Sequence, residues 1–134
     1  MDTEELVRRF EAGEAPEGGF HHAQHVQVAW HYLCQSPLPL ALERFAAALK
    51  HFAVAQRAPT LYHETITTAY ILIINERLDR AAEPDWSRFA KENPDLLTWK
   101  PSVLDRYYTP ETLWSDRAKQ TFVKPDRLSL GSAP

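Results

Sequence analysis

The sequence predicts an all-α protein, a helical bundle of four to six helices with an irregular C-terminal extension. Three observations support this fold class. Apolar residues recur at three- and four-residue steps in several separate stretches, which is the period of an amphipathic helix. Prolines stand between these stretches, where they end one helix before the next begins. Asn-Gly and Asp-Gly pairs, the strongest short-range signals of a β-hairpin, do not occur in the sequence.

Two helices are expected before the first proline-rich break. A short helix over residues 3–12 ends in the glycine- and proline-containing loop 13–19. A second helix begins at about His21 or His22 and runs to Cys34. Its apolar face is spaced as a helix requires and consists of Val26, Ala29, Trp30 and Leu33.

Two longer helices are expected in the middle of the chain. The break at residues 36–39 contains two prolines and precedes a helix over about 40–56. The next helix spans about 61–80, with Thr60 as its cap. Its middle, residues 69–74, is apolar all round. A helix of that kind is surrounded by others, so we place it at the centre of the bundle.

The C-terminal third is interrupted by prolines and predicts only short elements. We expect short helices at residues 86–92, 102–107 and 110–122, and an extended or partly disordered tail over 122–134. The sequence contains no internal repeat and no second-domain boundary. Residues 1–134 are therefore predicted to form a single helical domain.

Composition excludes some classes of partner. The chain has 134 residues and a net charge of −3, whereas nucleic acid and anionic membranes call for a basic surface. No apolar run approaches the roughly 20 residues that cross a bilayer. The single cysteine, Cys34, has no partner for an internal disulfide, which fits a reducing cytoplasm. We therefore expect a cytoplasmic protein that binds neither nucleic acid nor membrane.

A group of histidines at the start of the second helix is the strongest functional signal. His22 and His25 continue the apolar stripe backwards, because positions three apart differ by only about 60° around a helix, and His21 lies at its edge. Short connections favour antiparallel neighbours, so the second and fourth helices run parallel and their N-terminal ends meet. This arrangement brings the histidine pair beside His63 and Glu64.

Converging imidazoles predict a divalent transition metal held by His22, His25 and His63. Neutral imidazole binds Zn, Fe, Cu, Ni or Mn, and the sequence does not choose among them. Three protein ligands leave an open position, as in catalytic sites. Glu64 is either a fourth ligand, an acceptor for a histidine N–H, or the general base of a metal-dependent hydrolase, lyase or oxygenase. His63 ranks above it as a ligand, because adjacent helical residues point about 100° apart.

A second hypothesis needs no metal and no reaction. Histidines at helix starts also cap backbone N–H groups or form a polar pocket wall, and the protein is then a non-catalytic ligand-binding or protein-interaction module. His31 and His51 are expected to lie in solvent. Both hypotheses are compatible with a small-molecule ligand. The irregular tail offers surface to a second copy, so a homodimer is also compatible with the sequence.

Two motifs resemble an uncharacterised family of small bacterial all-helical proteins: Phe20-x-His22-x-x-His25 followed by Ala29-Trp30, and Tyr62-His63-Glu64-Thr65. The run from Tyr107 to Asp126 is also similar to the ending of that family. The resemblance implies that His22, rather than His21, is the family histidine. It implies no particular activity.

Overall fold

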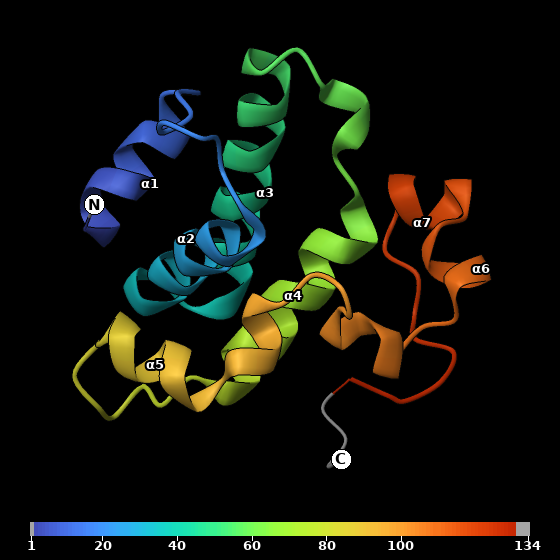
Figure 1. Cartoon of the computed structure of the whole chain (residues 1–134). Coiled ribbons are helices and arrows are strands. Elements are labelled where there is room, and N and C mark those ends of the chain that lie inside the picture. The colour runs from blue at the N-terminus through green and yellow to red at the C-terminus, as the bar shows by residue number, and fades with distance from the viewer. Residues whose placement is uncertain (1, 131–134) are drawn as a thin grey trace.

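The structure is a computed structural model that describes residues 2–130. This part of the chain contains helices and no strand, which confirms the predicted all-α class (Figure 1). The α-helices are α1 (Thr3–Glu11), α2 (His22–Gln35), α3 (Leu38–Ala55), α4 (Glu64–Arg77), α5 (Trp86–Glu92), α6 (Pro110–Leu113) and α7 (Asp116–Gln120). Three short 3₁₀ helices complete the order: η1 (Pro59–Leu61), η2 (Pro94–Leu97) and η3 (Val103–Arg106).

Residues 2–130 contain seven α-helices, one more than the upper limit of the predicted bundle, and one of the expected helices is interrupted. The stretch 110–122 folds as α6 and α7, separated at Trp114 and Ser115. The Ser115 hydroxyl oxygen accepts a hydrogen bond from the backbone N–H of Ala118 at 3.2 Å. A serine that caps in this way starts a new helix instead of continuing the old one.

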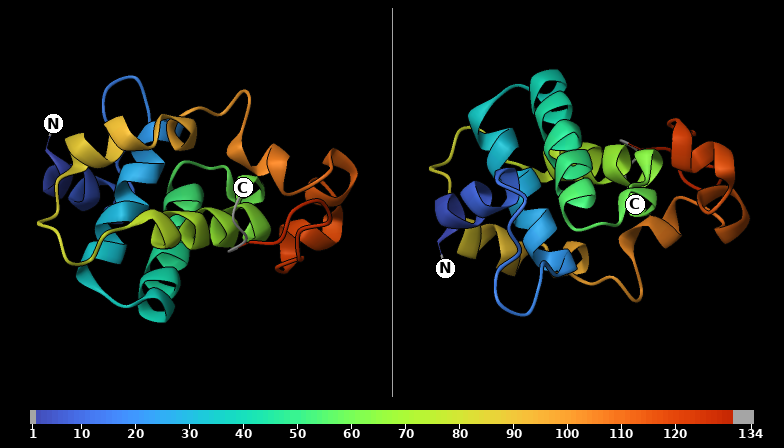
Figure 2. Two further views of the ribbon diagram at one scale, coloured as in Figure 1. Left: turned by 90° about the horizontal axis from the view of Figure 1, so that it is seen from below. Right: turned by 90° about the horizontal axis from the view of Figure 1, so that it is seen from above.

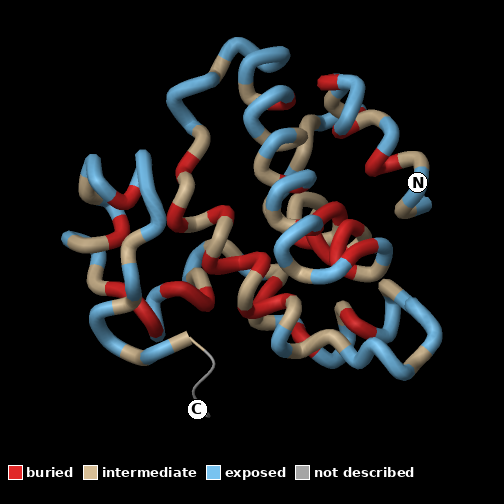
Figure 3. The backbone as a smooth tube through the Cα atoms, turned by 180° about the vertical axis from the view of Figure 1, so that it is seen from behind, coloured by how far each residue is buried: buried red, intermediate tan, exposed pale blue. Residues whose placement is uncertain are grey.

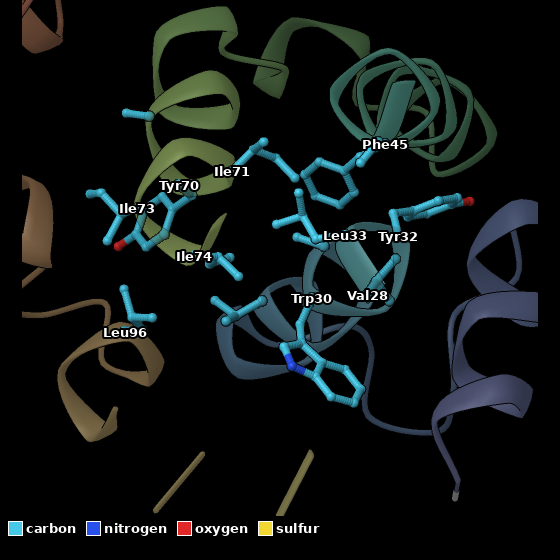
Figure 4. Packing of buried hydrophobic residues seen from close by; sticks show 14 of the residues in the cluster. Val28, Trp30, Tyr32, Leu33, Phe45, Tyr70, Ile71, Ile73, Ile74 and Leu96 are labelled. Atoms are coloured by element: carbon cyan, nitrogen blue, oxygen red, sulfur yellow. The ribbon is translucent and has the colours of Figure 1, made fainter. Parts of the chain in front are cut away.

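Helix α4 lies at the centre of the molecule, as its apolar middle predicts. It packs against α2 and α3 on one side and against α7 near its N-terminal end. Buried positions run along its length (Figure 3). Figure 4 shows Ile71 and Ile74 on the side of Phe45 and Leu33, which belong to α3 and α2, whereas Ile73 lies on the side of Leu96. All six side chains are buried.

The limits of α4 differ from the predicted 61–80. The helix begins only at Glu64, because His63 is its N-cap, and η1 occupies the preceding turn. The expectation that Thr60 caps this helix is wrong. At the other end, Leu78 has extended backbone angles (φ −76°, ψ 127°). The helix is therefore shorter at both ends than its apolar pattern indicates.

Partly buried hydrogen bonds hold the C-terminal segment, residues 107–130, against α4. This segment lies at the opposite end of the molecule from α1 (Figures 1 and 2). The hydroxyl of Thr65 donates to the carbonyl of Thr121 at 2.9 Å and accepts from the N–H of Val123 at 3.0 Å. The hydroxyl of Tyr108 also donates to the Val123 carbonyl, at 2.6 Å. Residues 122–130 are non-helical, as expected, and 131–134 lie outside the described residues.

No helix within residues 2–130 has both the length and the apolar character that crossing a membrane requires.

Candidate functional site

A cavity of about 640 Å³ lies between α2, α3 and α4. Two tryptophans from the C-terminal third also line it: Trp99, which lies between η2 and η3, and Trp114, which follows α6. Leu61 and Trp114 are 79% and 52% exposed, so the cavity reaches solvent at this edge. Most of its lining is aliphatic or aromatic, and none of the lining residues is Asp, Glu, Lys or Arg. Its lining residues with a polar side-chain group other than the indoles are His22, His25, Gln56, Tyr62, His63, Thr67 and Tyr70.

His22, the first residue of α2, is half-buried and held by contacts from two other segments. Its Nε2–H donates to the backbone carbonyl of Leu96 in η2 at 2.9 Å. Its ring lies 5.0 Å from the ring of Tyr70 and 5.1 Å from that of Trp99, centroid to centroid. Burial lowers the pKa of His22, although the hydrogen bond to Leu96 opposes this shift. The ring is therefore neutral near pH 7, with Nδ1 left as an acceptor.

His25 lies one turn further along α2 in an aromatic environment. Its ring centroid is 5.8 Å from Phe10, 5.5 Å from Phe20 and 6.2 Å from Phe52. Burial lowers the pKa of His25 to about 4, and the nearby His22 adds to the shift. No group within residues 2–130 forms a hydrogen bond with either ring nitrogen. His25 is thus a neutral imidazole whose donor and acceptor are both unused.

His63 is buried and uses both ring nitrogens to hold the structure together. Its Nδ1 accepts from the backbone N–H of Ile66 at 3.1 Å, which caps α4. Its Nε2–H donates to the carbonyl of Leu113 at 2.7 Å. Burial lowers the pKa of His63, with the Leu113 hydrogen bond opposing that shift. The ring also meets Trp114 edge to face, at 5.4 Å between centroids.

Glu64 does not share the cavity with the other predicted site residues. It is not among the residues that line the cavity, and its carboxylate accepts a hydrogen bond from the Tyr62 hydroxyl at 2.5 Å. Burial and this hydrogen bond raise the pKa of Tyr62. The expected divergence of His63 and Glu64 is therefore present, because His63 lines the cavity and its neighbour does not.

The structure brings His22, His25 and His63 to one cavity, yet their nitrogens do not converge on one point. Within residues 2–130, no group of three or more His, Cys, Asp or Glu side chains is placed to hold a metal ion. Among the described residues nothing bonds Nδ1 of His22 or either ring nitrogen of His25, whereas both ring nitrogens of His63 are bonded. A metal bound by all three would require His63 to give up its cap on α4 or its bond to Leu113.

Sequence reasoning missed the aromatic walls supplied by Trp99 and Trp114. Both stand in the irregular C-terminal third, where no helical period indicates which way a side chain faces. It also missed the carbonyls of Leu96 and Leu113, because a backbone acceptor leaves no residue-type signal. His21 is exposed and is the N-cap residue of α2.

Comparison of the chain with protein-family models, with curated proteins and with solved structures finds no match. The resemblance to a bacterial family stays a prediction, and the function has to be argued from the cavity itself.

Proposed function

We propose that this protein binds a small, largely apolar molecule in the cavity between α2, α3 and α4. The observation that carries the proposal is the cavity itself. Its volume of about 640 Å³ falls within the roughly 300–1,000 Å³ of typical small-molecule sites. Such sites are lined mainly by apolar and aromatic side chains, with a few polar groups that fix the orientation of the ligand. The lining described above has this composition.

The arrangement of the aromatic residues supports the same proposal. The ring centroids of Tyr70 and Trp99 lie 6.4 Å apart. The His22 ring centroid is 5.0 Å from that of Tyr70 and 5.1 Å from that of Trp99. Trp99 also meets Trp114 edge to face at 6.5 Å. Flat aromatic surfaces of this kind contact a ligand over a large area and lose little conformational freedom on binding.

A cavity-filling substitution tests this function. Ala53 of α3 lines the cavity, so Ala53→Phe places an aromatic ring inside it. Ala47 lies on an exposed face of the same helix, and Ala47→Phe is the matched control. We expect saturable binding of the neutral fluorescent probe N-phenyl-1-naphthylamine, with about one site per chain. Ala53→Phe should weaken it at least tenfold, and Ala47→Phe should leave it unchanged. Equal binding by the two variants, or no saturable binding, contradicts the proposal.

A metal site is the second candidate, because three imidazoles line one cavity and His22 and His25 have unused nitrogens. On this hypothesis, Zn, Fe, Cu, Ni or Mn would bind there, and Glu64 would support a metal-dependent reaction. Purification without chelator followed by elemental analysis tests it. One metal per chain in the wild type, lost in the His22→Ala/His25→Ala variant with the fold kept, supports the hypothesis. If the purified protein holds no metal, and none of the five ions changes its melting temperature, the metal hypothesis is wrong.

A further inference from the structure

The chemistry of the cavity wall also indicates what kind of small molecule the site selects, an inference that rests on the proposed function. We propose that the preferred ligand is an uncharged aromatic compound bearing a hydroxyl group, a phenol-type molecule, with His25 as the residue that hydrogen-bonds the hydroxyl.

The charge of the cavity wall favours an uncharged ligand. Among residues 2–130, the cavity wall contains no acidic or basic side chain apart from its histidines. Charged groups stand behind the wall at Tyr62, where Glu64 accepts the hydrogen bond of the phenolic hydroxyl and Lys50 lies 5.1 Å from the ring centroid. An ionised ligand would lose its hydration in this site and find no opposite charge inside it. The cavity therefore favours neutral molecules.

The His25 ring has hydrogen-bonding capacity that the described residues do not use. Within the described residues, every fully buried side-chain nitrogen or oxygen has a hydrogen-bond partner. The His25 ring has no such partner, so its nitrogens are not fully shielded, and the space that this residue lines is the cavity. His22 and His63 differ, since their Nε2–H groups are already given to backbone carbonyls. His25 is thus the one cavity imidazole, among the described residues, that still offers both a donor and an acceptor.

The ligand class follows from combining these two observations. The burial of His25 keeps its imidazole neutral near pH 7, so one nitrogen donates and the other accepts. A hydroxyl group both donates and accepts, and it can pair with either tautomer. The rings of Phe20 and Phe52 flank His25, and Trp99 and Tyr70 form another part of the wall. A flat aromatic body carrying a hydroxyl matches both features.

Three probes of similar shape test the proposal: naphthalene, 2-naphthol and 2-naphthoate. By titration of tryptophan fluorescence at pH 7, the wild type should bind 2-naphthol about fivefold to tenfold more tightly than naphthalene, as one net hydrogen bond allows. It should bind the 2-naphthoate anion more weakly than either. His25→Phe should bind naphthalene and 2-naphthol equally, while the exposed-residue control His51→Phe should keep the preference.

The outcomes separate this inference from the proposed function. Binding of N-phenyl-1-naphthylamine together with equal affinity of the wild type for naphthalene and 2-naphthol overturns the inference only. Failure to bind any of the neutral probes overturns the proposed function as well. Tighter binding of 2-naphthoate overturns the selection for neutral ligands.

A measurement on the wild type keeps the test valid if His25→Phe fails to fold. The imidazole ¹⁵N signals of His25 should shift on adding 2-naphthol and should move much less with naphthalene. Equal shifts with the two probes would show that the hydroxyl does not bind there.

Discussion

The Nε2–H of His63 donates to the carbonyl of Leu113 at 2.7 Å, across fifty residues of chain. The same ring caps α4 through its other nitrogen, at 3.1 Å from the Ile66 backbone nitrogen. One buried side chain therefore starts the central helix and fastens the C-terminal segment to it. Trp114, the residue after Leu113, lines the cavity, so this histidine also fixes part of the cavity wall.

Removing this side chain should destabilise the fold. His63→Ala removes the helix cap, which lowers the free energy of unfolding by about 0.5–2 kcal/mol. It also leaves the Leu113 carbonyl without its donor, which costs about 1 kcal/mol more. His63→Asn should recover part of the loss, because asparagine is a good N-cap but is too short to reach Leu113. Urea unfolding measures both variants against the exposed-residue control His51→Ala. A His63→Ala protein as stable as the control would contradict this role.

Acid should destabilise the protein through His25. Its pKa is about 4 in the fold against 6.5 for an ordinary histidine, so the unfolded chain takes up a proton first. The contribution of His25 to the free energy of unfolding is fully present above pH 6.5. It is lost as the pH falls toward 4, and the loss amounts to at most about 3 kcal/mol. The lowered pKa values of His22 and His63 act in the same direction.

Urea unfolding between pH 7.5 and pH 4 measures this dependence. His25→Phe cannot titrate, so its stability should fall less steeply than that of the wild type or of His51→Phe. Parallel pH profiles for the wild type and His25→Phe would show that His25 contributes nothing to the acid sensitivity.

The attachment of the C-terminal segment should depend on Thr65. This side chain is fully buried and bonds both Thr121 and Val123. Thr65→Val keeps the shape but leaves a carbonyl and an N–H without a partner, at a cost of about 1–3 kcal/mol. Thr68→Val, at a less buried position of α4, is the control. Hydrogen exchange at the Val123 amide should become faster in Thr65→Val and stay unchanged in Thr68→Val. Equal exchange rates in the two variants would contradict the role of Thr65.

The helical pattern predicted the fold well where apolar stripes are long. Helices α2 and α3 begin and end within about two residues of their expected limits, and the apolar run 69–74 marks the central helix. Prediction failed where single polar side chains decide the backbone. The His63 cap shortened α4, and the Ser115 cap divided the last helix into two. Residue spacing does not show such local hydrogen bonds.

The sequence predicted that three histidines would lie near one another, whereas the metal and the role of Glu64 stay predictions. Parallel helix starts predicted that His22, His25 and His63 would meet, and all three line one cavity. Spacing did not show which ring nitrogens would be taken by the carbonyls of Leu96 and Leu113. Those acceptors lie in short, irregular segments far along the chain. Their use leaves His25 as the cavity imidazole with both nitrogens unbonded within residues 2–130, and for this reason we propose a small-molecule ligand ahead of the predicted metal.

The indole N–H signals of the four tryptophans give the most direct test of the central claim. Trp99 and Trp114 line the cavity, whereas Trp30 and Trp86 pack together elsewhere, 5.5 Å apart between centroids. In a ¹H–¹⁵N spectrum, N-phenyl-1-naphthylamine should shift the signals of Trp99 and Trp114 and leave the other two in place. If Trp30 and Trp86 shift as much, or if no indole signal moves while the probe is bound, the cavity is not the binding site.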